Sequence, residues 1–351
     1  MAGNLLDSMT KEAAFDGLPA NVVKLENQSG MSITLMDIGA TWLSCTLSVK
    51  SEEREVLLGT STMSDFKKMS GYMGVTAGRF ANRIAKGQFE INGQSHQLLV
   101  NQAGNTLHGG PEGFNARRWD VISQSDSHVQ FGLLSEDGDQ GFPGNLNAFV
   151  RYELSADNEV VISYKASTDQ STPVNLTNHA YFNLMGEGSG VSCKSFSLQM
   201  NAEQYLPTDN VGIPLGQLAY VENTSFDFRQ RKQVDSDFLS DEQQKNANGY
   251  DHSFYLNPEC KDGACAAVVS TLDDSVTMKV YTDKPAIQLY TGNWLSGEPS
   301  RTSGEYQSYA GIALETQFLP DSPNHPEWEQ ESCILKPDEE YRYQTKYQFE
   351  Y

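Results

Sequence analysis

The amino-acid sequence predicts an all-β protein, a large antiparallel sandwich or barrel, and two observations support this prediction. Apolar and polar residues alternate with a period of two through many short segments, which is typical of strands with one buried face. Glycine, asparagine and aspartate separate these segments, as they do at tight turns. The chain has 351 residues, and all-β folds often exceed roughly 200 residues as a single unit.

Two hairpins are predicted most clearly. Asn92-Gly93 lies inside QFEINGQSHQLL and is a dipeptide strongly favoured in two-residue hairpin turns. Further on, residues 147–154 (NAFVRYEL) and 159–167 (EVVISYKAS) both alternate, and a short turn joins them. We expect Ala148, Val150, Tyr152 and Leu154 on the buried face of the first strand, and Val160, Ile162, Tyr164 and Ala166 on that of the second.

The remaining pattern adds strands and very little helix. Residues 194–200 and 275–283 alternate in the same way and predict two more strands. Helical patterns are limited to 61–70 and 235–246, which we expect to be short connecting helices. No internal repeat, low-complexity tract or Pro/Ser linker divides the chain, so we expect a single domain.

The net charge of the chain restricts the classes of ligand that it is expected to bind. The chain carries 46 acidic and 25 basic residues, a formal net charge of -21. A field of this sign repels phosphate backbones and anionic lipid, which argues against nucleic-acid and membrane-surface roles. It disfavours phosphorylated substrates less strongly, and it leaves neutral ligands unaffected.

The N-terminus and the cysteines indicate a cytoplasmic protein. The first residues, MAGNLLDSMTKEAAFDG, contain neither a basic leader nor an apolar run, so we expect no signal peptide. The five cysteines are odd in number and mostly scattered, which suits a reducing compartment. Whether Cys260 and Cys265 interact stays open, as does the choice between a monomer and a homodimer.

Several common catalytic signatures are missing from the sequence. It has no GxxxxGK[ST] loop, no GxGxxG that opens a helix after a strand, and no GxSxG. The six histidines show neither HxxxH nor HExxH spacing, so nothing in the sequence predicts a metal site.

Polar and aromatic residues gather instead in a few glycine-rich or strand-end segments. Each has an ordinary alternative: His108 beside two glycines would cap a turn, His179 would be a structural histidine, and Asp251 would form an Asx turn. Glu315 is the least ordinary, because it follows Ile312-Ala313-Leu314, and a carboxylate in an apolar strand must be paired, neutral or functional. The candidate segments are GRFANRIAKG (78–87), NQAGNTLHGGPEGF (101–114), NLTNHAYFNL (175–184), GYDHSFYL (249–256), PAIQLYTGNWL (285–295) and GIALETQFLPDSPNHPEW (311–328).

Together these residues suit a site for a polyhydroxyl ligand. Amide, carboxylate, imidazole and guanidinium groups read sugar hydroxyls, while aromatic faces cover the C–H surfaces. The residues of these types in the candidate segments are Asn82, Arg83, His108, Asp251, Gln288 and the nearby aromatic residues. A histidine and a glutamate would add an acid/base pair.

The same strings resemble the aldose 1-epimerase (galactose mutarotase) family over nearly the whole chain. The resemblance extends from MDIGATWLSCTL (36–47) through NTLHGG, DGDQGFPGN (137–145) and NHAYFNL to LETQFLPDSPNHPEW. It implies a large antiparallel β-supersandwich over residues 11–351 with a few short helices and an open sugar cleft. Residues 1–10 extend past it, and we expect a flexible tail there.

The resemblance also implies roles for individual residues. Glu315 would be the general base at the anomeric hydroxyl and His179 the general acid at the ring oxygen, with no cofactor or metal. His108 would bind the sugar as a second active-site histidine. The other implied substrate-binding residues are Asn82, Arg83, Tyr181, Asp251 and Gln288.

The expected activity is interconversion of the α and β anomers of free hexoses, galactose or glucose. For this we expect a protonated His179 beside an ionised Glu315, whose charge would raise the pKa of the imidazole. Two alternatives remain: a non-catalytic carbohydrate-binding protein, and a hexose-6-phosphate 1-epimerase. A glycoside hydrolase, with Asp251 and Glu315 as its two carboxyl groups, fits less well because a histidine occupies the acid position.

Overall fold

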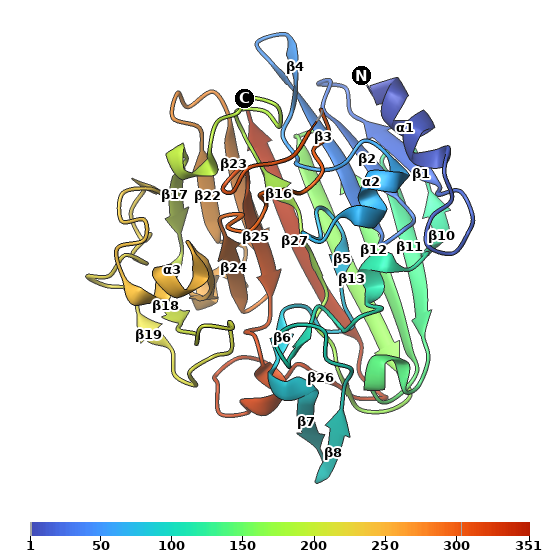
Figure 1. The fold of residues 1–351 in the computed structure, drawn as a ribbon, viewed down its shortest axis with the longest axis vertical. Coiled ribbons are helices and arrows are strands. Elements are labelled where there is room, and N and C mark those ends of the chain that lie inside the picture. The colour runs from blue at the N-terminus through green and yellow to red at the C-terminus, as the bar shows by residue number, and fades with distance from the viewer. Residues whose placement is uncertain (1, 303) are drawn as a thin grey trace.

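The structure, a computed structural model, describes residues 2–302 and 304–351, with side chains from residue 5 onward. In these residues the chain is mostly antiparallel strand with three short α-helices, so the predicted all-β class is confirmed (Figure 1). No helix in the described part is long and apolar enough to cross a membrane.

Three antiparallel sheets form most of the molecule. The largest has nine strands in the order β10-β11-β12-β13-β27-β23-β22-β17-β20. Their bounds are β10 Asp120–Gln124, β11 His128–Ser135, β12 Leu146–Leu154, β13 Glu159–Thr168, β27 Tyr341–Glu350, β23 Thr277–Thr282, β22 Ala267–Ser270, β17 Ser197–Met200 and β20 Lys232–Gln233.

The other two large sheets have six and four strands. The six-stranded sheet contains β16 Tyr181–Phe182, β25 Ile312–Gln317, β24 Ala286–Tyr290, β21 Asp251–Leu256, β18 Ala202–Leu206 and β19 Ala219–Tyr220, in that order. The four-stranded sheet contains β1 Val22–Glu26, β2 Ser32–Met36, β3 Thr41–Val49 and β4 Glu52–Glu55. Four two-stranded pairs complete the topology: β14 Thr172–Pro173 with β26 Ile334–Leu335, β15 Thr177–Asn178 with β5 Thr76–Ala77, β6 Arg83–Ile84 with β9 Thr106–Leu107, and β7 Gln88–Ile91 with β8 Gln94–Gln97.

Buried aromatic rings join the three sheets. Trp42 of β3, Phe182 of β16 and Tyr347 of β27 contact one another, with ring centroids 5.2–5.8 Å apart. All three side chains belong to one large apolar cluster that draws on strands from both ends of the chain. Burying rings of this size contributes on the order of 2–3 kcal/mol each. The core therefore lies between the nine-stranded sheet and the two smaller sheets.

The predicted hairpins are confirmed. β12 pairs with β13 from Leu146↔Thr168 to Leu154↔Val160, and all eight residues expected on the buried faces are buried. β7 and β8 meet at Asn92-Gly93, where both residues have positive φ (53° and 78°), as a type I′ turn requires.

The two predicted connecting helices are shorter than expected. α2 covers Met63–Lys68, inside the predicted 61–70, and α3 covers Glu242–Ala247, which ends one residue past the predicted 235–246. Thr62 caps α2 by accepting from the Asp65 N–H, and Asp241 caps α3 in the same way at Gln244.

The N-terminal segment differs from the flexible tail that we expected for residues 1–10. Residues Ala2–Thr10 form helix α1, and Leu5 and Met9 are buried in a second apolar cluster. These two residues lie four apart and thus on one helix face. They pack with residues such as Met36, Met63 and Phe66. This apolar face anchors the segment to the four-stranded sheet and α2.

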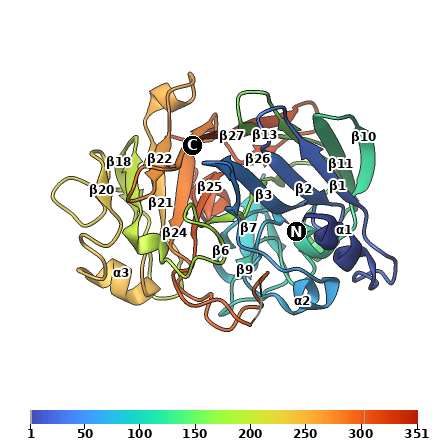
Figure 2. The same cartoon turned by 90° about the horizontal axis from the view of Figure 1, so that it is seen from above.

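The topology brings distant segments together in the middle of the molecule. Viewed from above (Figure 2), β1, β2 and β3 lie toward one end and β18, β20 and α3 toward the other, with β24 and β25 between them. Every candidate segment supplies residues to strands or strand ends in this central region.

Candidate active site

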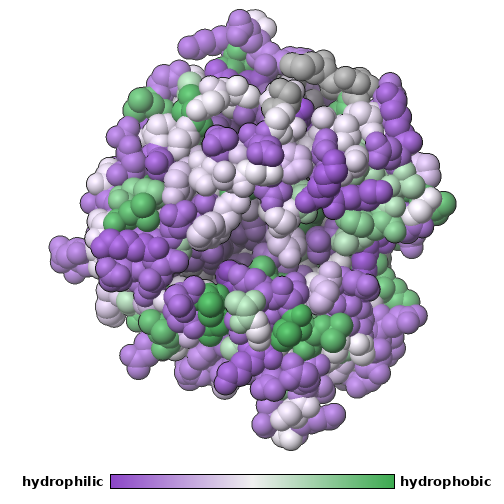
Figure 3. Space-filling view, viewed as in Figure 1, coloured by the Kyte–Doolittle hydropathy of each residue, from purple (hydrophilic) through white to green (hydrophobic). Residues whose placement is uncertain are grey.

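A pocket of about 210 Å³ brings together most of the candidate residues. Figure 3 shows a hollow near the centre of the face drawn in Figure 1, over β24 and β25. Seven of the eight predicted site residues line the pocket: Asn82, Arg83, His108, His179, Tyr181, Asp251 and Glu315.

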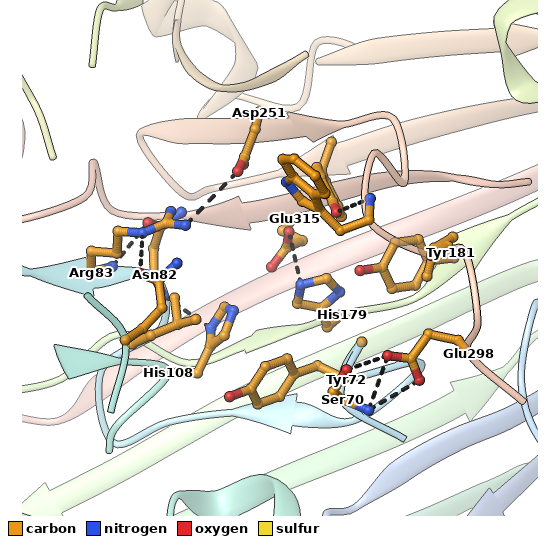
Figure 4. A pocket seen from close by; sticks show the side chains of 16 residues that line it. Ser70, Tyr72, Asn82, Arg83, His108, His179, Tyr181, Asp251, Glu298 and Glu315 are labelled. Carbon is orange, nitrogen blue, oxygen red and sulfur yellow. Dashed lines mark hydrogen bonds and ion pairs between the residues drawn. The ribbon is translucent and has the colours of Figure 1, made fainter. Parts of the chain in front are cut away.

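Glu315 and His179 lie side by side at the base of this pocket. Glu315 is in β25, the strand buried along its whole length, and is 2% exposed. His179 directly follows β15 and is 5% exposed. Its Nε2 lies 3.5 Å from Glu315 Oε1 (Figure 4), while Glu315 Oε2 and His179 Nδ1 are buried without a hydrogen-bond partner. Buried polar atoms without a partner are uncommon in folded proteins, and a catalytic role is one of their recognised explanations.

Burial works against the charge state that we expected for this pair. Desolvation lowers the pKa of His179 to about 4, against a smaller opposing effect of Asp251. Desolvation, with a contribution from Asp251, raises the pKa of Glu315 well above its usual value. A protonated His179 beside an ionised Glu315 is thus not favoured in the empty pocket, because the low-dielectric site disfavours both charges. The pair holds one proton in total over a wide pH range.

His108 is fixed as a neutral hydrogen-bond donor. Its Nδ1 accepts a hydrogen bond from the backbone N–H of Asn82 at 3.1 Å, which leaves the proton on Nε2. Burial, with contributions from His179 and Arg83, lowers the pKa of His108 well below its usual value. Its ring lies 5.2 Å from that of His179, at nearly a right angle.

Arg83 and Asp251 lie on one side of the pair (Figure 4), and Gln102 lines the pocket with them. Arg83 Nη2 lies 4.0 Å from Asp251 Oδ2, and Arg83 Nε donates to Gln102 Oε1 at 3.0 Å. Arg83 is the one Lys or Arg side chain among the described residues that line the pocket, whose lining also includes three carboxyl groups, those of Asp251, Glu298 and Glu315. A single guanidinium already engaged by two neighbours leaves little positive charge to hold a phosphate.

Gln288 is the predicted site residue that does not line the pocket. It pairs with Glu315 across β24 and β25 and is 2% exposed. Its Nε2 donates to Asp251 Oδ1 at 2.7 Å. Gln288 therefore lies beneath the pocket surface and orients the carboxylate of Asp251, which lines the pocket.

Several lining residues were not among those expected from the sequence, notably Ser70, Tyr72, Gln102 and Glu298. Tyr72 and Gln102 lie in or beside glycine-rich segments, which is a weak local signal, whereas nothing in the sequence around Glu298 indicates burial. Trp294, an aromatic residue of the candidate segment 285–295, is 66% exposed at the pocket. Phe182, in the candidate segment 175–184, packs in the core instead.

No group of three or more His, Cys, Asp or Glu side chains within residues 2–302 and 304–351 is arranged to hold a metal ion. The chemistry that the site offers is that of one imidazole and one carboxyl group in contact, surrounded by hydroxyl-binding groups. Such a pair moves protons between neighbouring oxygen atoms. The fold and pocket thus define an antiparallel β-sandwich with a buried imidazole–carboxyl pair among side chains that can bind hydroxyl groups.

Comparison with known proteins gives the family. The family model described as aldose 1-epimerase matches residues 21–348. The chain is 48% identical to the aldose 1-epimerase of Escherichia coli K12 over 341 residues (97% of this chain, 98% of that protein), and 36% identical to human galactose mutarotase (96% and 97%). Among solved structures, a galactose 1-epimerase from Lactobacillus acidophilus superposes with a TM-score of 0.83 at 32% identity (95% and 96%). An aldose epimerase homologue from C. elegans superposes with a TM-score of 0.85 at 27% identity (95% and 99%). The chain belongs to the aldose 1-epimerase family.

The buried histidines should make the protein sensitive to acid, and His252 offers a test away from the chemistry. His252 is fully buried between Tyr205 and Phe226, and burial lowers its pKa to about 4. In the unfolded chain the pKa is about 6.5, so the unfolded state binds more protons between these values. The contribution of the neutral His252 to stability is then fully present above about pH 6.5 and is lost as the pH falls toward 4. The unfolding free energy of the parent protein should fall between pH 7 and pH 5. In His252→Phe that fall should be smaller by about 2 kcal/mol, because the variant has no imidazole to protonate at this position. Urea unfolding at the two pH values measures this, and parallel losses in both proteins would contradict it.

Proposed function

We propose that this isomerase interconverts the α and β anomers of free hexoses, galactose and glucose, by general acid–base ring opening and reclosure. The buried contact between His179 and Glu315 inside a hydroxyl-binding pocket is the observation that supports the proposal most directly. The names of the relatives, aldose 1-epimerase and galactose mutarotase, agree with it.

The proposed reaction needs two proton transfers at one carbon. Glu315 removes the proton of the anomeric hydroxyl while His179 protonates the ring oxygen, so the bond between C1 and the ring oxygen breaks and C1 becomes a carbonyl. Rotation about the bond between C1 and C2 then presents the other carbonyl face. Ring closure reverses both transfers and gives the opposite anomer.

Substrate binding would set the charges that this sequence of steps requires. The pair holds one proton in the empty pocket, and sugar hydroxyls that donate to Glu315 Oε2 would favour the ionised carboxylate. The 3.5 Å gap between His179 Nε2 and Glu315 Oε1 closes to hydrogen-bonding distance with a small side-chain shift, which would let the proton pass to the imidazole. His108, Asn82, Arg83 and Asp251 would hold the ring hydroxyls meanwhile.

Neither alternative function is favoured by a specific observation. A binding protein needs hydroxyl-reading groups but has no use for a buried imidazole and carboxyl group in contact, since leaving them incompletely hydrogen-bonded costs stability. A hexose-6-phosphate epimerase needs several cations around the phosphate, and the described lining residues include Arg83 alone.

The state of the cysteines bears on the location that we propose for the protein. All five cysteines are free thiols in the structure. We propose a cytoplasmic location and a monomer or homodimer.

Removing either proton-transfer group should abolish most activity. Glu315→Gln and His179→Asn keep the size and polarity of the side chain, and each should lower kcat at least a hundredfold, since one positioned acid or base typically contributes 10²–10⁴-fold. Polarimetry of α-galactose with circular dichroism of each variant measures the effect. His128→Asn, on β11 outside the pocket, is the matched control. If either pocket variant retains near-full turnover, the role proposed for that residue is wrong.

The pH dependence should be a broad plateau. Below the lowered pKa of His179, near 4, the pair gains a second proton and has no base; above the raised pKa of Glu315 it loses its only proton and has no acid. Activity should therefore stay high around neutral pH and fall at both extremes. The profile of kcat/KM from pH 4 to 10 is the measurement, and a rate that rises steadily with pH would contradict the proposal.

Substrate charge should matter more than epimer identity. We expect kcat/KM for α-glucose 6-phosphate to be at least tenfold below that for α-glucose, because Arg83 is the one cation among the described lining residues and is already engaged by Asp251 and Gln102. Side-by-side mutarotation rates with α-galactose included test this. Equal or faster turnover of the phosphate ester would favour the sugar-phosphate alternative.

A further inference from the structure

Residues 70–76 hold the backbone of His179 on both sides. The His179 N–H donates to the Val75 carbonyl, and the Gly74 N–H donates to the His179 carbonyl, both at 2.9 Å. One residue further on, β5 pairs with β15, so Thr76 lies opposite Asn178. The position of the His179 backbone in the pocket therefore depends on this one segment.

The same segment places an aromatic ring against the imidazole. Tyr72 lies 6.0 Å from His179 in a stacked arrangement, with 27° between the ring planes, and 4.7 Å from the ring of His108. The backbone of Tyr72 has a φ of +56°, a left-handed conformation that a bulky residue keeps only where its surroundings enforce it. Something outside residues 70–76 must supply that restraint.

Glu298 contacts the start of the segment. Its carboxylate accepts hydrogen bonds from the Ser70 N–H at 3.0 and 3.2 Å and from the Ser70 hydroxyl, across 228 positions of sequence. The carboxylate is buried, with Glu298 7% exposed, and lies with Ser70 on the opposite side of His179 from Arg83 and Asp251 (Figure 4). Gly71 is packed so closely that a Cβ there would lie 3.3 Å from Leu295 and 3.6 Å from the Glu298 carboxyl carbon. Hydrogen bonds to a buried carboxylate are stronger and more directional than neutral ones.

We propose that Glu298 is a positioning residue for His179, which acts through Ser70 and the segment 70–75. The inference rests on the proposed role of His179 as the general acid. Glu298 holds Ser70, the fixed loop keeps the Tyr72 ring stacked, and the imidazole is thereby held at the distance from Glu315 that proton transfer requires. A small displacement of a catalytic group lowers turnover far more than it lowers binding.

The experiment compares three changes. Glu298→Ala removes the carboxylate, and Glu298→Gln keeps one acceptor oxygen for Ser70. Glu305→Gln is the matched control, because Glu305 is an exposed carboxylate on the same loop. Polarimetry of α-galactose gives kcat and KM, and thermal melts set an assay temperature at which every variant is folded.

We expect Glu298→Ala to lower kcat about tenfold with KM within twofold of the parent, Glu298→Gln to recover part of that loss, and the control to be unchanged. The acidic limb of the pH profile should also move to higher pH. A loosened ring regains water, and the pKa of His179 rises from its lowered value toward the ordinary one. The titratable groups around the imidazole are Tyr72, His108, Tyr181, Tyr290 and Glu315, with Arg83 and Asp251 beyond them.

Loss of stability alone would leave kcat per folded molecule and the acidic limb unchanged, and that result would overturn the inference. A rise in KM alone would overturn it as well, because Glu298 would then bind the sugar. If Glu298→Ala does not fold, Ser70→Ala removes one hydrogen bond of the same contact, and we expect it to lower kcat about threefold with the same shift of the limb. An inactive Glu315→Gln beside a fully active Glu298→Ala would reject this inference and leave the proposed function standing, whereas an active Glu315→Gln would reject both.

Discussion

The structure depends on one constraint, the burial of a carboxyl group in the middle of a fully buried strand. β25 lies between β16 and β24, and every residue from Ile312 to Gln317 is buried. The two faces of β25 have different surroundings. Ile312 and Leu314 pack in the main core, while Glu315 points to the other face and into the pocket. Placing an ionisable group there is costly unless neighbours or a ligand complete its hydrogen bonds.

The surrounding framework makes this burial tolerable by holding β25 in one position. The Tyr347 hydroxyl donates to the Leu314 carbonyl at 3.0 Å, and Thr316 contacts Thr345 through its hydroxyl, so β27 of the nine-stranded sheet fixes the strand from its core side. Gln288 on β24 lies directly opposite Glu315 and orients Asp251. A rigid strand under the site keeps Glu315 in place without any direct hydrogen bond to its Oε2 atom.

The sequence predicts features that depend on neighbours in the chain much better than features that depend on distant segments. Alternation determined the β12–β13 hairpin down to the buried face, and Asn92-Gly93 determined the β7–β8 turn, because both signals are local. Residues 315 and 179 could be proposed as partners only through family resemblance, since 136 positions separate them and no periodicity links them. Leu5 and Met9 are apolar and four positions apart, which is a local signal for a helix in a segment where none was expected. Glu298 gave no signal, because its carboxylate is held by Ser70, which lies 228 positions away in the sequence.

The burial of His179 and Glu315 has a chemical consequence that an exposed pair would lack. In water a histidine and a glutamate share one proton only between their ordinary pKa values, roughly 4.3 and 6.5. Burial lowers the pKa of His179 to about 4 and raises that of Glu315 well above its usual value, so the one-proton state of the pair extends upward in pH to the raised pKa of the carboxyl group. One proton is also the number that anomer exchange needs, since each turnover removes a proton at one oxygen and returns it at another. The same desolvation that makes Glu315 and His179 costly to bury therefore keeps the pair in the one-proton state that the proposed proton transfers use.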